Sequence, residues 1–278
     1  MANPTDDSSW KWYGDPAASG AVNSPVMAGR PPIRAVVFDA GHTLLEMDYA
    51  RLTAYLVSRG HALGEARVTE AERRARMRLD VERAAQSSRV RTGEGRYVRY
   101  LVEYLGIVDD VERTAIGEWR RGFNAPIGLC HQADGEAAKA LQHARDMGLV
   151  VGVISNSNGS VQRALVIAGL AAHLEFVIDS SMVGITKPDP RIFELGARAA
   201  RATPEEIVYI GDSYFVDVVG ARRAGLGAVL FDPGGVWGAR DCAIATGLCA
   251  AVEQALDQSA RRARAETSSR GERDEAKH

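Results

Sequence analysis

Short apolar runs recur along the chain and alternate with longer stretches whose apolar residues return every three to four positions. The runs are rich in Val and Ile, which is typical of strands buried on both faces of a sheet. Five strands are predicted in this way: Ala35–Asp39, Leu149–Ser155, Phe176–Asp179, Ile207–Gly211 and Ala228–Phe231. Strands that alternate with helices through short connections predict an α/β fold, a doubly wound parallel sheet with helices on both faces.

Three of the intervening stretches have clear helix boundaries. The first, Gly135–Met147, stops at Gly148, and glycine is common just past the end of a helix. Ser160 is expected to cap Val161–Ala168 with its side chain. Asp189-Pro190 is expected to open Arg191–Ala200, because proline is favoured in the first turn.

One long stretch breaks this alternation. From Met47 to Leu129 there is no strand-like run, and helical patterns rich in Arg, Glu and Ala are interrupted at Gly60, Gly93–Gly95 and Gly106. An all-helical insert after the first strand predicts a cap over the α/β core. Between Arg51 and Arg99 twelve arginines face six acidic residues. That surplus would attract an anionic substrate, although such runs are more often solvated helix faces with arginines paired to acids four residues away.

The predicted organisation has four parts. Residues 1–32 are rich in Pro, Gly, Ser and Asp and are expected to form a disordered N-terminal tail, with Trp10, Trp12 and Tyr13 as an unusual aromatic group. The α/β core is expected to comprise 33–46 and 130–257, with the helical cap at 47–129 between them. A charged C-terminal tail is expected at 258–278, where basic and acidic residues alternate without apolar spacing.

Composition narrows the function classes. With 46% hydrophobic residues, 34 Lys+Arg and 36 Asp+Glu, the chain is an ordinary packed protein of net charge −2. No overall field attracts nucleic acid or a membrane surface, and no apolar run approaches the ~20 residues that span a bilayer. The three cysteines form no C-x-x-C pair and the N-terminus has no signal-peptide pattern. We therefore expect a cytoplasmic protein with no nucleic-acid or membrane partner; the pattern does not indicate an oligomeric state.

Polar residues collect where the predicted strands end. Asp39 follows the first strand, Ser155 and Asn156 the second, and Asp212 the fourth, with Asp217 five residues further on. Lys187 lies in a loop before the fourth strand. In a parallel sheet these ends share one edge, where ligands bind. Two close carboxylates repel each other unless a cation lies between them, and Mg²⁺ prefers such oxygen ligands together with substrate phosphate.

This set of residues, in this chain order, resembles the haloacid dehalogenase superfamily, whose members include Mg²⁺-dependent phosphatases with an aspartate nucleophile. The resemblance covers about Pro32 to Leu256. It implies a Rossmann-like core with a helical cap of the family's first type. Asp39 matches the nucleophile of the family's first motif and Ser155 the Ser/Thr of the second. Lys187 matches the lysine of the third motif, and Asp212 and Asp217 match the acidic pair of the fourth.

The resemblance also implies a covalent mechanism. Asp39 would attack the phosphorus of a small phosphorylated molecule, giving an aspartyl-phosphate that water hydrolyses. An oxygen of Asp39, the backbone carbonyl of Gly41 and Asp212 would hold Mg²⁺, with Asp217 orienting the site from close by. Ser155 and the amide of Asn156 would bind the phosphate oxygens, and Lys187 would neutralise developing charge.

The sequence departs from the family pattern beside the nucleophile. Family phosphatases carry a second Asp two residues after the first, as general acid and base; here that residue is Gly41, followed by His42. General acid–base catalysis contributes about 10²–10⁴-fold, so an alkyl phosphate is expected to be a slow substrate. Three explanations stay open. The substrate has a leaving group that needs no proton, or another group such as His42 supplies the proton. In the third, the protein binds a phosphorylated ligand or partner without efficient catalysis.

Three other activities have to be weighed against phosphate hydrolysis. Metal-independent 2-haloacid dehalogenases often have the Ser-Asn pair seen at Ser155-Asn156, but Asp212 favours a metal and hence phosphate over halide. Phosphonate-cleaving members need a Schiff-base lysine from the cap, and residues 47–129 contain none. A phosphoacceptor switch also uses a strand-end Asp with a distant Lys, but the chain is too long for such a domain alone.

Overall fold

The computed structural model describes residues 33–85, 94–124 and 128–258 of the 278-residue chain. The expected N-terminal tail with its aromatic group therefore lies outside the described residues, as does the expected C-terminal tail apart from residue 258.

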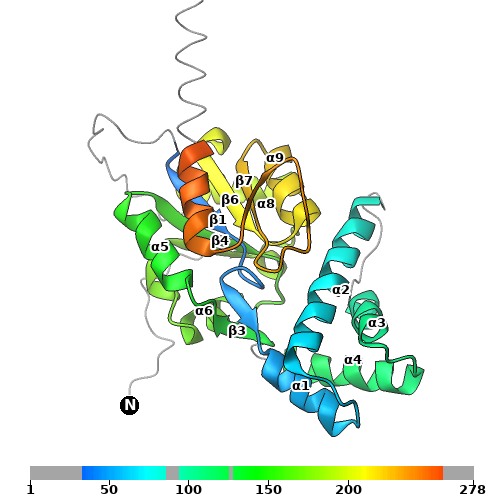
Figure 1. Ribbon diagram of the computed structural model, residues 1–278. Helices are drawn as coiled ribbons and strands as arrows, with labels where there is room; N and C mark the ends of the chain where they lie inside the picture. Colours follow the sequence, from blue (N-terminus) through cyan, green and yellow to red (C-terminus); the bar gives the residue numbers. More distant parts are fainter. Residues whose placement is uncertain (1–32, 86–93, 125–127, 259–278) are drawn as a thin grey trace, which may run out of the picture.

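The centre of the molecule is a six-stranded sheet in which every neighbouring pair is parallel (Figure 1). The strand order is β5-β4-β1-β6-β7-β8. The strands are β1 (Ala35–Phe38), β4 (Val150–Ser155), β5 (Phe176–Asp179), β6 (Ile207–Gly211), β7 (Gly227–Phe231) and β8 (Ala243–Ala245). The α/β doubly wound class is thus confirmed.

Helices cover both faces of this sheet because successive strand residues point to opposite sides. In β1, Val36 and Phe38 pack with α5, α6 and a helix that begins at residue 248, whereas Ala35 and Val37 pack with α8 and α9. The core helices are α5 (Ala137–Asp146), α6 (Val161–Ile167), α7 (Ser180–Val183), α8 (Pro190–Ala200) and α9 (Gly220–Arg223). Two apolar cores, one on each face, therefore fix the sheet.

Four helices and a short two-stranded ladder form the cap region (Figure 1). The ladder pairs β2 (Leu45–Met47) with β3 (Cys130–Ala133) in antiparallel fashion. The segment that leads from the core into the cap helices therefore lies beside the segment that returns to the core. Between them lie α1 (Tyr49–Ser58), α2 (Glu65–Ala85), α3 (Glu94–Leu105) and α4 (Asp110–Asn124). These helices have an apolar core of their own, which includes Leu52, Leu56, Tyr100, Leu101 and Ile116.

One expected detail of the helix ends is wrong and one is confirmed. Ser160 precedes α6, but its hydroxyl donates to Asn158 Oδ1 and makes no cap bond to the helix. Asp189 does cap α8, with its carboxylate accepting from Arg191 N at 3.0 Å and Pro190 in the first turn. Among the described helices, none is both long enough and apolar enough to cross a membrane.

Candidate active site

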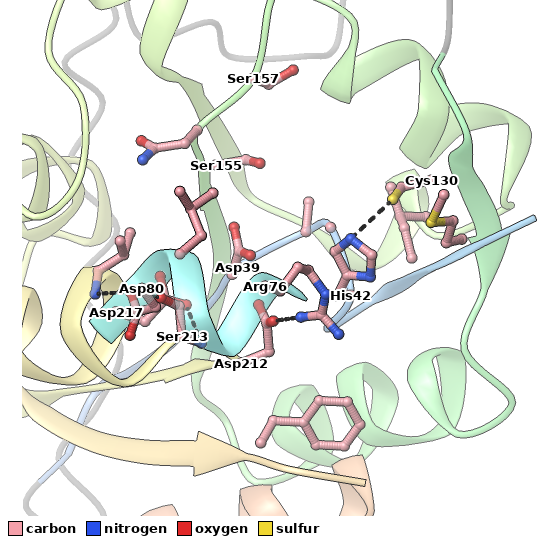
Figure 2. Close-up of a pocket in the computed structure, with 18 of the residues that line it drawn as sticks. Asp39, His42, Arg76, Asp80, Cys130, Ser155, Ser157, Asp212, Ser213 and Asp217 are labelled. Atoms are coloured by element: carbon pink, nitrogen blue, oxygen red, sulfur yellow. Dashed lines mark hydrogen bonds and ion pairs between the residues drawn. The ribbon is translucent and has the colours of Figure 1, made fainter. Parts of the chain in front are cut away.

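A cavity of about 490 Å³ lies at the edge of the sheet where β1, β4 and β6 end. Asp39 directly follows β1, Ser155 closes β4 and Asp212 directly follows β6, and all three line the cavity (Figure 2). Parallel strands bring these three segments, far apart in the sequence, to the same edge. The other side of the cavity is lined by residues of the cap helices α2 and α4.

Lys187 is the centre of a buried hydrogen-bond cluster in the wall of this cavity. Its Nζ lies 2.7 Å from Asp39 Oδ1, 2.7 Å from Asp217 Oδ1 and 2.8 Å from the hydroxyl of Tyr209. Burial lowers the pKa of Lys187, but the charges of Asp217 and Asp39 outweigh it, so the net shift is upward. The ammonium group therefore stays charged and holds one oxygen of Asp39 in place. Tyr209 completes the cluster by donating to Ile154 O at 2.7 Å.

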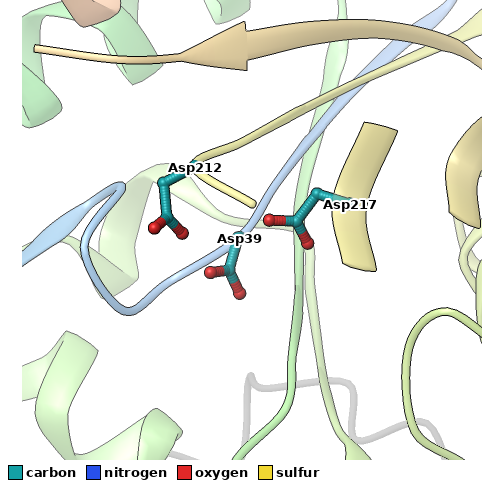
Figure 3. A group of neighbouring side chains, drawn as sticks. All are labelled: Asp39, Asp212 and Asp217. Carbon is teal, nitrogen blue, oxygen red and sulfur yellow. The ribbon is translucent and has the colours of Figure 1, made fainter. Parts of the chain in front are cut away.

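Three carboxylates meet at the cavity floor. One oxygen each from Asp39, Asp212 and Asp217 lies within 4.8 Å of the others (Figure 3). Burial raises the pKa of Asp217 to about 6, and Asp39 adds to this while Lys187 opposes it. Burial likewise raises the pKa of Asp212, against the opposing charge of Arg76. Hard oxygen donors that need a nearby cation to remain ionised fit Mg²⁺.

Gly41 and His42 lie two and three residues after Asp39, in the β1–β2 loop, and both line the cavity. A Cβ built on Gly41 meets no heavy atom within 4 Å, and its φ lies outside the left-handed region. His42 has φ +61°, and its Nε2 lies 3.6 Å from Cys130 Sγ and 3.6 Å from Glu72 Oε1. Burial, then the charge of Arg76, lowers the pKa of His42 to about 3. The imidazole is therefore neutral at physiological pH and is a poor proton donor.

The two expected phosphate ligands at the end of β4 differ in what they contact. Ser155 is buried and lines the cavity, close to Asp39 (Figure 2). The side chain of Asn156 instead pairs with the main chain of Lys187: Nδ2 donates to Lys187 O at 3.0 Å and Oδ1 accepts from Lys187 N at 2.8 Å. That amide side chain therefore positions the lysine loop, and only the main chain of Asn156 is left to meet a ligand.

Cap helix α2 contacts the segment that carries the acidic pair. Arg76 donates to Asp212 Oδ2 and, through Nε, to both oxygens of the fully buried Glu72 at 2.9 and 3.0 Å. One turn further on, Asp80 accepts from the hydroxyl of Ser213 and from the main-chain N–H groups of Phe215 and Val216 at 2.7 and 3.2 Å. These contacts fix the position of α2 against the loop and the π-helical segment Tyr214–Val219.

Several of these residues were not anticipated from the sequence. Tyr209 lies inside a strand and carries no motif of its own. Arg73, Arg76, Asp80 and Arg83 recur at intervals of three and four, which places them on one face of α2. That spacing is a readable signal of a shared face, but only the tertiary structure shows that this face lines the cavity.

Comparisons with known proteins agree with this geometry. A model of the family described as haloacid dehalogenase-like hydrolases matches residues 33–225. A phosphoserine phosphatase of Thermus thermophilus is 45% identical over 100 residues, or 36% of this chain and 40% of that protein. A glyceraldehyde 3-phosphate phosphatase of Methanopyrus kandleri is 36% identical over 87 residues, or 31% of this chain and 37% of that protein. These matches thus span less than half of either relative's length.

Solved structures share the fold at lower sequence identity. The L-2-haloacid dehalogenase of Xanthobacter autotrophicus, with chloropropionic acid covalently bound, superposes with a TM-score of 0.53 and 20% identity. The superposition covers 80% of this chain and 97% of that one. At this identity the likeness supports the common fold and says nothing of a common substrate.

Proposed function

Because the chain belongs to the haloacid dehalogenase-like hydrolase family, we propose that it is a Mg²⁺-dependent phosphohydrolase in which Asp39 attacks a small phosphorylated substrate. The observation that carries the proposal is the Lys187 cluster, with Nζ 2.7 Å from both Asp39 and Asp217 and with Asp212 closing the carboxylate group. A buried nucleophile with a fixed cation on one oxygen, beside further carboxylates, suits in-line transfer of a phosphoryl group.

Asp39, Asp212 and the main-chain carbonyl of Gly41 would hold the Mg²⁺, and Asp217 would orient the site through its bonds to Lys187 and to Ser213 N. When bound, the ion supplies positive charge for the transferring phosphoryl oxygens and keeps the surrounding carboxylates ionised. The donor set supports this assignment because these close carboxylates, two buried and one partly buried, outnumber the two cations that contact them, Lys187 and Arg76, so a further cation would relieve their repulsion.

The protein's own residues account for the covalent steps. Lys187 holds Asp39 Oδ1 and so orients the carboxylate, whose other oxygen forms the bond to phosphorus as the bond from phosphorus to the leaving oxygen breaks. Water then attacks the phosphorus of the aspartyl-phosphate, which releases phosphate and regenerates Asp39. Ser155 and the main-chain amide of Asn156 would hold the phosphoryl oxygens that do not react.

Gly41 limits which leaving groups react quickly. The leaving oxygen carries away the bonding electrons and must take a proton from water, because glycine has none to give and His42, with a pKa of about 3, is unprotonated at neutral pH. Leaving groups that are stable as anions, such as acyl phosphates, anhydrides and aryl phosphates, should therefore react faster than alkyl phosphates.

A phosphatase panel that spans acyl, aryl and alkyl phosphates, measured with Mg²⁺ and with excess chelator, tests this function. We expect Mg²⁺-dependent release of phosphate in the order acyl and aryl above alkyl, and loss of release in Asp39→Asn, because an amide is no nucleophile. Retained activity in Asp39→Asn would overturn the covalent mechanism. Halide release from a 2-haloacid in chelator would instead identify a dehalogenase, and phosphate binding without any turnover would identify a binding protein.

A further inference from the structure

Four arginines of the cap helices line the cavity opposite the strand ends. Arg73, Arg76 and Arg83 come from α2, and Arg120 comes from α4. They arise from two separate helices and face a phosphoryl site built from the core. The cavity is thus basic on its cap side and acidic at its floor.

Three of these arginines make no ion pair or hydrogen bond with the residues that the structure describes. The charge of Arg83 acts on Asp80, and that of Arg73 acts on Glu46 at a longer range. Arg76 is neutralised by Glu72 and Asp212. Arg73 and Arg120, in contrast, make no ion pair or hydrogen bond within the described ranges, and Arg120 Nε is buried without an acceptor. A buried donor such as Arg120 Nε is normally satisfied in a native protein, so the arrangement calls for an acceptor that the described residues do not supply.

Both side chains are nevertheless held in place. The guanidinium of Arg120 lies 4.1 Å from the centre of the Tyr97 ring, whose hydroxyl is fixed by Glu72 at 3.0 Å. Arg73 passes closely over Gly234, where an added Cβ would lie 2.9 Å from Arg73 Cδ and 3.0 Å from its Nη1. Packing of this kind orients a guanidinium before a ligand arrives and lowers the entropy cost of binding it.

Four of the cap arginines that do not line the cavity behave differently. Arg59, Arg74, Arg78 and Arg113 each lie within 3.1 Å of a Glu or Asp oxygen. The ordinary explanation of an arginine-rich helix, a solvated face of ion pairs, therefore fits these residues. It does not fit Arg73 and Arg120, whose charges both act on His42 inside the cavity.

We propose that Arg73 and Arg120 form a second anion subsite, so that the substrate is a phosphate ester bearing a second anionic group, either a carboxylate or another phosphate. The planar guanidinium fork pairs with both groups. The inference rests on the proposed function, which assigns the reacting phosphoryl group to Asp39, Ser155 and the lysine cluster. A cavity of about 490 Å³ holds a small molecule that reaches both ends.

The test compares substrates that differ only in charge. The 3- and 4-isomers of carboxyphenyl phosphate are measured against the corresponding carbamoylphenyl phosphates, which have the same shape without the charge, and phenylene bisphosphates supply the second-phosphate arm. Their aryl leaving groups avoid the missing proton donor. For each enzyme the readout is the ratio of kcat/KM for the charged substrate to that for the neutral one.

We expect a ratio of about 10 to 100 in the wild type. This is the rate difference that corresponds to the free energy of charge-assisted hydrogen bonds to a carboxylate or phosphate. Arg73→Gln/Arg120→Gln should bring the ratio close to one, mainly through KM. The matched control, Arg74→Gln/Arg121→Gln, removes the same charge from the adjacent positions of the same helices, which do not line the cavity. It should keep the wild-type ratio. If the double variant unfolds, Arg73→Lys and Arg120→Lys, which keep the charge without the fork, should each lower the ratio.

The outcomes separate this inference from the proposed function. Turnover of the aryl phosphates with a wild-type ratio near one for every charged substrate would overturn the subsite, as would an equal loss in the control variant. A preference confined to the carboxylate or to the bisphosphate would identify the second anion. Failure to hydrolyse any aryl phosphate in Mg²⁺ would overturn the proposed function itself, and the subsite as a substrate site with it.

Discussion

Replacing Gly41 by aspartate should convert the enzyme into a faster phosphatase for alkyl esters. The position accepts the side chain, because a Cβ there meets no heavy atom within 4 Å and the backbone does not need the left-handed conformation. The residue already lines the cavity beside Asp39. The new carboxyl group would therefore stand where a leaving oxygen needs a proton.

The size of the effect follows from what the native site lacks. His42 is neutral at physiological pH and Lys187 is bound to two carboxylates, so neither acts as a ready acid. A general acid contributes about 10²–10⁴-fold, or about 3–5 kcal/mol. A new carboxylate about 5 Å from that of Asp39 would be repelled by about 3 kcal/mol at an effective dielectric of 20. That repulsion raises the pKa of the new group toward neutrality, as a general acid requires.

The assay compares glycerol 3-phosphate, an alkyl ester, with p-nitrophenyl phosphate, whose leaving group departs without a proton. Gly41→Asp should raise kcat/KM for the alkyl ester by about 10²-fold or more and for the aryl ester far less. Gly41→Asn has nearly the same shape but an amide that does not supply the proton, so it is the matched control and should give no gain.

Three results would refute this reasoning. An equal gain on both esters would mean that the substitution improves binding or metal affinity rather than proton transfer. A gain in Gly41→Asn would assign the effect to shape. No gain in a folded Gly41→Asp protein that still binds Mg²⁺ would mean that proton donation does not limit the native enzyme.

Two further substitutions test the groups that hold the site together. Lys187→Met should destabilise the metal-free protein by about 3–5 kcal/mol, since it leaves Asp39 and Asp217 buried without their cation. The loss in Tm should shrink from pH 8 to pH 5, because the pKa of Asp217 is already raised to about 6 and removing the lysine raises it further, and it should also shrink on adding Mg²⁺. A pH-independent loss would contradict this. Asp80→Ala should lower the free energy of unfolding by about 2–4 kcal/mol, because it removes the acceptor for two backbone N–H groups. It should also raise the Mg²⁺ concentration needed for activity. The control Asp110→Ala, at an exposed position, should change neither the stability nor the Mg²⁺ requirement.

The strands of the sheet could be read from the sequence because hydrophobic burial dictates them locally. Phe176–Asp179 and Ile207–Gly211 were predicted with the bounds that the structure has, and the other three predicted strands differ from it by one residue at one end. The strands that were missed, β2, β3 and β8, are three or four residues long. β3 has the sequence CHQA and no fully buried side chain. Such strands exist because a partner strand is nearby, and no local pattern encodes that.

The candidate site also has one part that the sequence predicts and one part that it does not. Asp39, Ser155 and Asp212 could be located because each follows or ends a buried strand, and the topology of a parallel sheet brings strand ends together. The contributions of the cap could not be located. Of the twelve arginines between Arg51 and Arg99, those that face the cavity differ from the others only in how α2 is placed against the core, and that placement depends on contacts across more than 130 residues of chain.

The placement of α2 also constrains the size of the substrate. Arg76 and Asp80 fix the helix against Asp212 and the residues that follow it. Arg73 lies three residues before Arg76, which is about 4.5 Å along a helix axis. Arg73 of the proposed anion subsite is therefore held close to Arg76 and, through it, to Asp212 of the core, and a second anion must lie near the reacting phosphorus to use both. Small phosphorylated acids or bisphosphates meet that requirement, and long phosphorylated chains do not.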